Sequence, residues 1–183
     1  PGPQTMTGPL TGLRVVDLTR DLGRFATKLL AEAGASVVRG VGVGERGNDM
    51  TDPVANAKGG VLDWWFDGGM TKVDLDLDTE TGRANYRRLV DVADLVIEGQ
   101  PPGRLARWGL DHADVRASNP GLTQISVTPY GRTGPWAEWE SSDLVAGALG
   151  GVLSITGLPD QPLNSWGGQN HAFGGFAAAV CAL

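Results

Sequence analysis

The feature that most constrains this chain is a regular alternation of short apolar, β-branched runs with amphipathic helical segments. Residues 13–18 (LRVVDL) and 36–41 (SVVRGV) have the composition of buried strands, and residues 24–33 between them carry apolar side chains at helical spacing. Gly34 follows this segment, as glycine often does at the C-terminus of a helix. A strand, a helix and a strand in this order predict a βαβ unit with parallel strands and a right-handed crossover.

The same alternation continues along the chain. We predict further strands over residues 73–77, 94–98 and 122–128, and helices over residues 81–93, 110–118, 142–153 and 172–183. Residues 42–71 are rich in Gly, Asp and Asn, so we predict a long surface excursion there, with a short strand near residues 62–66. The whole pattern predicts an α/β fold: a Rossmann-like, mostly parallel sheet with helices on both faces. Ligands of such sheets bind at the carboxyl ends of the strands.

The composition argues against several classes of function. The net charge is −6, from 15 basic and 21 acidic residues, and this balance argues against a nucleic-acid partner, which needs a basic surface. We expect no membrane segment, because no apolar run approaches the roughly 20 residues that span a bilayer. The single Cys181 excludes an internal disulfide and fits a reducing, cytoplasmic location. His112 and His171 lie far apart without a Cys pair beside them, so we expect no metal site.

The two ends of the chain differ in character. We interpret residues 1–8 as a tail or a remnant of cloning, and residues 9–183 as a single domain. The apolar helix predicted at the other end runs to Leu183 without a capping signal. We therefore expect that the polypeptide is truncated or cleaved, or that it is half of a two-chain assembly.

A glycine-rich motif, GxGxxG at residues 42–47, follows the second predicted strand. A dinucleotide site would need a helix to begin there, so that the helix N-terminus could hold the pyrophosphate. The next residues, NDMTDP, do not have the pattern of a helix. The motif is therefore weak evidence for a dinucleotide site.

Four stretches of the sequence resemble one family when they are taken together. They are PLTGLRVVDLT at residues 9–19 with FATKLLAEAGASVVR at 25–39, VDLDLDTETGR at 73–83, ADLVIEGQPPGRLARWGL at 93–110, and YGRTGP at 130–135 with SDLV at 142–145. In order and spacing they are similar to the motifs of family III CoA-transferases (CaiB/BaiF) and of the related α-methylacyl-CoA racemases.

This resemblance implies a Rossmann-like domain that handles CoA and precedes a small domain beyond residue 183. It implies acyl-CoA and carboxylic acids as substrates, with CoA as a substrate rather than a tightly bound cofactor. In that family two subunits form interlocked rings. The expected assembly is therefore an interlocked homodimer, or a heteromer with a second CoA-transferase-like chain.

The resemblance also assigns residues to CoA. Arg107 matches the arginine of the family's RPGxLxRLG motif, and Trp108 stands where the family has an apolar residue near the adenine. Arg39 and Arg46 lie at or near the family's basic positions after the second strand. A guanidinium suits phosphate because its planar fork donates two parallel hydrogen bonds. The alternative for each arginine is an ordinary solvated surface charge.

Other positions depart from the family pattern. Gly99 and Gln100, which we take as candidate CoA-binding residues, stand where the family has Asn-Phe. The loop that contains Leu22-Gly23-Arg24 is one residue shorter than the family's AGP loop. Each departure weakens the CoA contacts that the resemblance implies.

The largest departure is at the nucleophile. Family III transferases use an aspartate in a pattern like GD-x-x-x-G, which attacks the acyl-CoA and forms an anhydride and then a thioester. Counting back from Gly175, this place falls on His171, with Asn170 beside it. The racemases pair that aspartate with a histidine, and Ser142 takes the place of this histidine here. Both familiar mechanisms therefore lack a member.

Three explanations follow for this site. His171 acts itself as base or nucleophile, Asp143 or Asp160 supplies a carboxylate, or the chain is a noncatalytic half. The simpler alternatives are that Asp143 favours a helix N-terminus and that His171 only begins a helix. Our leading hypothesis is an enzyme that moves CoA between carboxylic acids. A noncatalytic CoA-binding or assembly subunit and a racemase-like isomerase are the alternatives.

Overall fold

The computed structural model describes residues 7–42 and 61–183, and their main element is a sheet of five parallel strands. The strands are β1 (Arg14–Leu18), β2 (Ser36–Val41), β3 (Thr71–Asp74), β4 (Leu95–Glu98) and β5 (Thr123–Ser126). Their spatial order is β3-β2-β1-β4-β5, so the order reverses between β1 and β4. The predicted Rossmann-like parallel sheet is confirmed.

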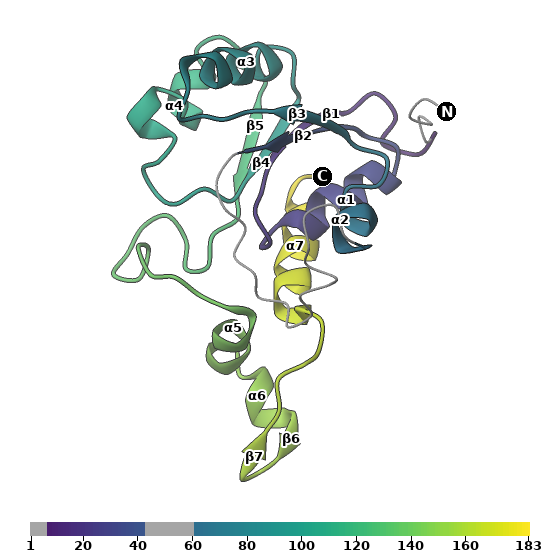
Figure 1. Cartoon of the computed structure of the whole chain (residues 1–183), viewed down its shortest axis with the longest axis vertical. Coiled ribbons are helices and arrows are strands. Elements are labelled where there is room, and N and C mark those ends of the chain that lie inside the picture. The colour runs from purple at the N-terminus through teal and green to yellow at the C-terminus, as the bar shows by residue number, and fades with distance from the viewer. Residues whose placement is uncertain (1–6, 43–60) are drawn as a thin grey trace.

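Helices cover both faces of this sheet (Figure 1). The helices of the described residues are α1 (Arg24–Glu32), α2 (Val61–Phe66), α3 (Glu80–Val90), α4 (His112–Val115), α5 (Asp143–Leu149), α6 (Val152–Ile155) and α7 (Gln169–Cys181), with a 3₁₀ turn η1 (Ala106–Trp108). In Figure 1, α1, α2 and α7 lie on one face, and α3 and α4 lie on the other. None of the helices in the described part of the chain is long and apolar enough to cross a membrane.

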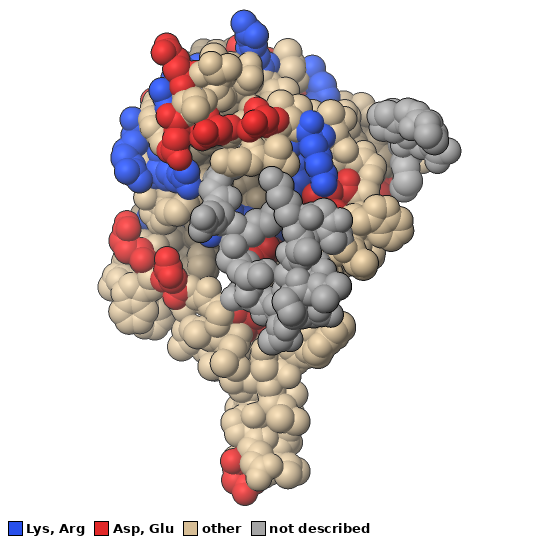
Figure 2. Space-filling view, in the orientation of Figure 1, with Lys and Arg blue, Asp and Glu red and all other residues tan. Residues whose placement is uncertain are grey.

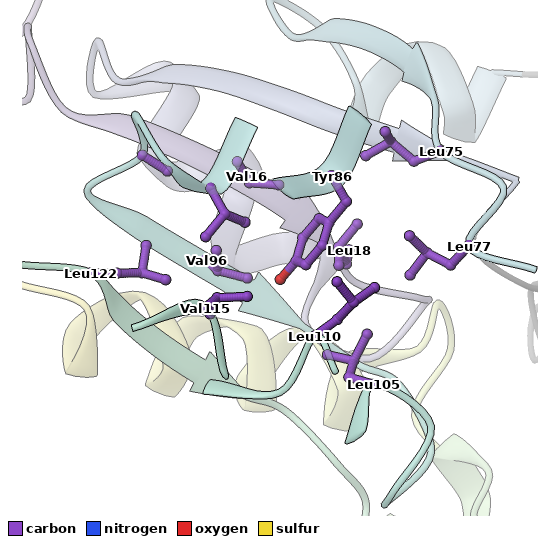
Figure 3. Close-up of a cluster of buried hydrophobic side chains, with 12 residues drawn as sticks. Val16, Leu18, Leu75, Leu77, Tyr86, Val96, Leu105, Leu110, Val115 and Leu122 are labelled. Atoms are coloured by element: carbon purple, nitrogen blue, oxygen red, sulfur yellow. The ribbon is translucent and has the colours of Figure 1, made fainter. Parts of the chain in front are cut away.

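Each face of the sheet is packed against its own hydrophobic cluster. Between the sheet and α3, the ring of Tyr86 lies beside Leu18 and Leu110 (Figure 3). On the opposite face, Leu30 of α1 and Ala178 of α7 pack against the sheet. Strands that are buried on both faces need side chains that are apolar in nearly every position, which explains the near-continuous apolar runs of the sequence.

Local signals fix several helix ends. Thr79 caps α3, because its hydroxyl accepts a hydrogen bond from the backbone N–H of Gly82 at 3.0 Å. The side chain of Ser142 does the same for α5. Gly34 follows α1 with φ 99°, a conformation that glycine adopts without a steric penalty.

Several predicted elements differ from the structure. The strand predicted over residues 73–77 is β3 at Thr71–Asp74. The strand predicted near residues 62–66 is wrong, because α2 lies there. Its run of bulky residues has strand composition, but Asp63 and Asp67 are four residues apart and both bind Arg24, which favours a helical turn. The helix predicted over residues 142–153 is two helices, because Gly151 between α5 and α6 adopts φ 80°. The last helix begins at Gln169, three residues earlier than predicted.

An arm projects from the body of the molecule (Figure 1). This arm, residues 143–168, consists of α5, α6 and the antiparallel hairpin of β6 (Gly157–Leu158) and β7 (Gln161–Pro162). Asp143 and Asp160 are its only charged residues, and Figure 2 shows the arm almost entirely without charged side chains. Many of its large apolar side chains are exposed: Leu144, Leu149, Ile155, Leu158, Leu163 and Trp166.

Candidate functional site

The reversal of strand order between β1 and β4 defines the candidate site. In sheets of this kind the loops after the two central strands diverge to opposite faces, and ligands bind at the carboxyl ends beside that point. Here the loops after three strands meet at Gly99. A side-chain Cβ on Gly99 would lie 3.2 Å from the backbone N of Arg20, and 3.4 Å from the carbonyl oxygens of Leu22 and Val127. Glycine allows this close approach of three backbone segments.

Hydrogen bonds fix the turn that follows Gly99. The backbone N–H of Gln100 donates to Glu98 Oε2 at 2.7 Å, and its side-chain Nε2 donates to the carbonyl oxygen of Leu18 at 2.9 Å. Glu98 and Gln100 are both buried. The two candidate residues Gly99 and Gln100 therefore lie at the switch point of the sheet, fastened to β1 and β4. Their role in CoA binding stays a prediction.

Arginine side chains gather around Trp108 on the loop after β4. The guanidinium groups of Arg104 and Arg83 lie 5.5 Å and 6.0 Å from the indole ring. Arg107 is exposed beside the half-buried Trp108 on η1. We call Arg83, Arg104, Arg107 and Trp108 the Trp108 patch. The sequence predicted Arg107 and Trp108 as CoA contacts, and this role stays a prediction. It did not point to Arg83 or Arg104, although the RxxR spacing of residues 104 and 107 was a signal for the latter.

Arg39 belongs to a buried network of ion pairs. Its guanidinium pairs with Asp17 at 2.5 Å and with Asp67 at 3.3 Å. Asp67 also pairs with Arg24 at 2.7 Å and with Lys72 at 2.8 Å. Burial acts to raise the pKa of Asp67, but the positive charges around it outweigh burial and hold this pKa below its ordinary value.

This network ties α2 to α1 and β2, and the sequence prediction missed it. The i, i+4 spacing of the two α2-side carboxylates was the available signal. The prediction that Arg39 contacts CoA is still a prediction, and such a contact would require these ion pairs to open. Arg46, and the part of the GxGxxG motif at residues 43–47, lie outside the described residues.

The start of α7 carries Asn170 and His171, which the sequence analysis placed at the position of the family's nucleophile. Asp143 is buried at the start of α5, and its Oδ1 accepts a hydrogen bond from the backbone N–H of His171 at 2.9 Å. Asn170 Nδ2 donates to Asp143 Oδ2 and to the Asp143 carbonyl oxygen, each at 3.0 Å. Asp143 thus caps α7, satisfying an N–H that lacks an intrahelical partner. The structure brings Asp143, Asn170 and His171 together, whereas exposed Asp160 lies in the hairpin turn of the arm.

Helix α7 connects this place to the switch point. A Cβ on Gly175 would lie 2.8 Å from Phe25 Cβ, so α7 crosses the first turn of α1 at close range. A Cβ on Gly174 would lie 3.0 Å from Leu22 Cδ1. The carbonyl of Leu22 borders Gly99, so one loop after β1 contacts both parts of the candidate site. His171 lies one helical turn before Gly174 on α7.

Across residues 7–42 and 61–183, no three His, Cys, Asp or Glu side chains are grouped so that they could hold a metal ion. Three features make up the candidate site: backbone loops at a switch point, an arginine patch with an aromatic ring on the loop after β4, and a capped helix start. The fold is that of a Rossmann-like protein, in which the carboxyl edge of the sheet is the place to look for a ligand site.

Comparison with known proteins identifies the family. The sequence profile of CoA-transferase family III matches residues 10–183. The chain therefore belongs to CoA-transferase family III (CaiB/BaiF). It is 39% identical over 167 residues to a succinate–glutarate CoA-transferase of Agrobacterium fabrum, covering 86% of this chain and 42% of that protein.

Comparison with one further relative and with one crystal structure supports the same family. The chain is 35% identical over 182 residues to subunit BbsE of a succinyl-CoA:(R)-benzylsuccinate CoA-transferase of Thauera aromatica, covering 91% of this chain and 42% of that subunit. The crystal structure of a CaiB/BaiF family protein from Brucella suis superposes with a TM-score of 0.86 and 31% identity, over 97% of this chain and 48% of that one. The chain thus spans about two-fifths to half of the length of the relatives it matches. The fold corresponds to the N-terminal part of this family.

Proposed function

We propose that this chain is the CoA-binding half of an enzyme that transfers CoA from an acyl-CoA to a second carboxylic acid. The observation that carries the proposal is the switch point itself, in a chain that belongs to CoA-transferase family III. Loops after β1, β4 and β5 meet at Gly99, where a Cβ would already be crowded. Glycine lets these three loops pack closely at the carboxyl edge of the sheet, and ligands of such sheets bind at that edge beside the switch point.

In this proposal the Trp108 patch binds the nucleotide end of CoA. The three arginines supply the positive charge that the phosphates need, and the indole offers a face for the adenine. Arg104 is already held by an ion pair with Asp78 at 3.3 Å, while Arg107 is exposed. Arg107 is therefore the residue that we expect to contribute most to phosphate binding.

His171 is the proposed reactive residue at the other end of the ligand. An imidazole can take up a proton near neutral pH, or attack the thioester carbonyl and release CoA as its thiolate. The acceptor carboxylate would then take the acyl group from the imidazole, which frees His171 and forms a mixed anhydride. The CoA thiolate would attack the acceptor's carbonyl carbon in this anhydride, forming the new acyl-CoA and releasing the donor acid as its carboxylate. The carboxylate of Asp143 accepts hydrogen bonds from the start of α7, which supports a role in holding His171 rather than in attacking the substrate.

The engagement of Asp143 by α7 favours a second candidate function, a noncatalytic subunit of a heteromeric transferase. If His171 is the counterpart of the family's aspartate, as the resemblance implies, that position has no carboxylate, while Asp143 is engaged by α7 and Asp160 lies on the arm. The relative BbsE is named as a subunit of its transferase. In this alternative the reactive aspartate belongs to a partner chain.

Further polypeptide is proposed to cover the arm and α7. Phe173, Phe176 and Val180 form an exposed apolar stripe on α7, opposite the glycine and alanine face that packs on α1. A helix that is apolar on all sides is normally buried. This supports an assembly with a C-terminal half and a second subunit, as an interlocked homodimer or a heteromer.

Calorimetry with CoA on the complete natural polypeptide tests the proposal. We expect wild type to bind CoA, and Arg107→Ala to weaken binding about tenfold, the loss of one charge-assisted hydrogen bond. Absence of CoA binding by the folded wild-type protein would refute the proposed function. Exchange of labelled CoA between two acids, measured with wild type and with His171→Ala, then separates the two candidates: a noncatalytic chain shows no exchange unless a second subunit is added.

A further inference from the structure

Glu98 is a buried carboxylate at the centre of the candidate site. It is the last residue of β4, and in the sheet it stands between Leu18 of β1 and Ser126 of β5. Its side chain is 2% exposed. Burial of a carboxylate costs free energy unless hydrogen bonds satisfy it, so a buried Glu at this place needs a structural or functional reason.

The hydrogen bonds of Glu98 indicate why a carboxylate is buried at this place. Its Oε2 accepts from the backbone N–H of Gln100 at 2.7 Å, which closes a turn around Gly99. Gln100 in turn fastens this turn to β1 through Leu18. Without Glu98, the N–H of Gln100 would be a buried donor with its acceptor removed, and the close approach at Gly99 would lose its anchor.

Groups from three further elements face Glu98. They are Tyr86 from α3, Asp111 at the start of α4, and Arg132 in the loop after β5. Arg132 binds both carboxylate oxygens of Asp111 at 2.9 Å and lies 3.4 Å from Ser126 Oγ. Burial raises the pKa of Glu98, and the hydrogen bonds from Ser126 and Gln100 and the charge of Arg132 offset only part of that effect.

We propose that Glu98 is a positioning residue, which holds the Gly99–Gln100 turn in the conformation that receives the CoA chain. The proposal rests on the proposed function, because it names a residue that serves the same site. Glu98 acts through the backbone of Gln100 and does not itself touch the ligand. What the turn needs from it is an acceptor oxygen at the Oε2 position, and a glutamine side chain also offers one.

Three variants of the complete polypeptide test this role. Glu98→Ala removes the acceptor, Glu98→Gln keeps it, and Asp94→Ala is the matched control. Asp94 flanks the opposite end of β4 and accepts hydrogen bonds from the backbone and side chain of Arg14. Its loss destabilises the protein without touching the carboxyl edge.

Two readouts are measured on each variant: the Kd for CoA by calorimetry and the hydrogen exchange of the Gln100 amide. We expect Glu98→Ala to weaken CoA binding by about tenfold or more and to speed this exchange, and Glu98→Gln to restore both to within about threefold of wild type. Asp94→Ala should leave both near wild type. Should Glu98→Ala not fold, Glu98→Asp, whose shorter side chain withdraws the oxygen, takes its place.

Wild-type CoA affinity in Glu98→Ala, or a folded Glu98→Gln that binds as poorly as Glu98→Ala, would overturn the proposal. If wild type itself does not bind CoA, the proposed function fails. The exchange of the Gln100 amide still decides in that case whether Glu98 holds the turn.

Discussion

Replacing Asp143 with alanine tests the connection between the arm and the body of the protein. The Asp143 carboxylate accepts one hydrogen bond from the His171 backbone and one from the Asn170 side chain, at 2.9 Å and 3.0 Å. Hydrogen bonds to a charged acceptor contribute about 1.5–3 kcal/mol each, and losing a helix cap costs about 1 kcal/mol. Asn170 Nδ2 keeps its bond to the Asp143 carbonyl oxygen. The cap is one of the two lost bonds, and two such bonds contribute about 3–6 kcal/mol. Because Asn170 keeps one partner, we expect a loss near the lower end, about 3–4 kcal/mol, in the free energy of unfolding.

The assay is urea unfolding, combined with hydrogen exchange of the His171 amide. Asp143→Asn should fall between wild type and Asp143→Ala, because its side-chain oxygen can still accept from His171 while its NH₂ faces that of Asn170. Asp160→Ala, at an exposed position of the hairpin, is the control and should change stability by less than about 0.5 kcal/mol. If Asp143→Ala unfolds like Asp160→Ala, and the His171 amide exchanges as in wild type, the cap does not hold α7 and the reasoning is refuted.

Three other predictions concern packing and charge. Gly175→Ala should lower the free energy of unfolding in urea by about 1–3 kcal/mol, because the new Cβ would lie 2.8 Å from Phe25 Cβ and force α1 and α7 apart. Unchanged stability would contradict the close crossing of these two helices. Burial raises the pKa of Glu98, so the native state holds this proton more tightly than the unfolded state does. The stabilisation that results is present below the ordinary pKa of 4.5 and is lost as pH rises through the raised value. The difference in unfolding free energy between wild type and Glu98→Gln should therefore fall as pH rises through this window, and a flat difference would contradict the shift. Asp67→Asn leaves buried cations without their carboxylate and should lower the free energy of unfolding by about 3–5 kcal/mol. Asp78→Asn, at an exposed ion pair, should lower it by less than about 1 kcal/mol. Equal losses in urea unfolding would show that the buried network is not coupled.

The sheet was predictable because its strands obey a local rule. A parallel strand buried on both faces is largely apolar, and the central residues of the two middle strands show this: Val15 and Val16 of β1, and Leu95, Val96 and Ile97 of β4. α2 was mispredicted because its helical form depends on Arg24, a residue 39 positions away from Asp63. The break at Gly151 is a backbone conformation that a helical pattern of small apolar residues does not reveal.

The candidate site was only partly predictable, because several of its contacts join residues that are far apart in the sequence. Resemblance to the family pointed to Gly99, Gln100 and His171, and the fold places the first two at the switch point. The bond between Asp143 and His171 joins residues 28 positions apart, and it exists only because the arm returns to the body. Arg39 has the sequence position of a phosphate ligand but the surroundings of an internal ion pair, and burial of this kind depends on the packed structure.

A crystal structure of the complete polypeptide with CoA tests the central claim most directly. The account predicts CoA across the carboxyl ends of β1 and β4, with its adenine on the Trp108 patch, its chain passing Gly99, and its sulfur directed toward His171. CoA bound at the amino edge of the sheet, or with its sulfur directed away from the start of α7, would contradict the account.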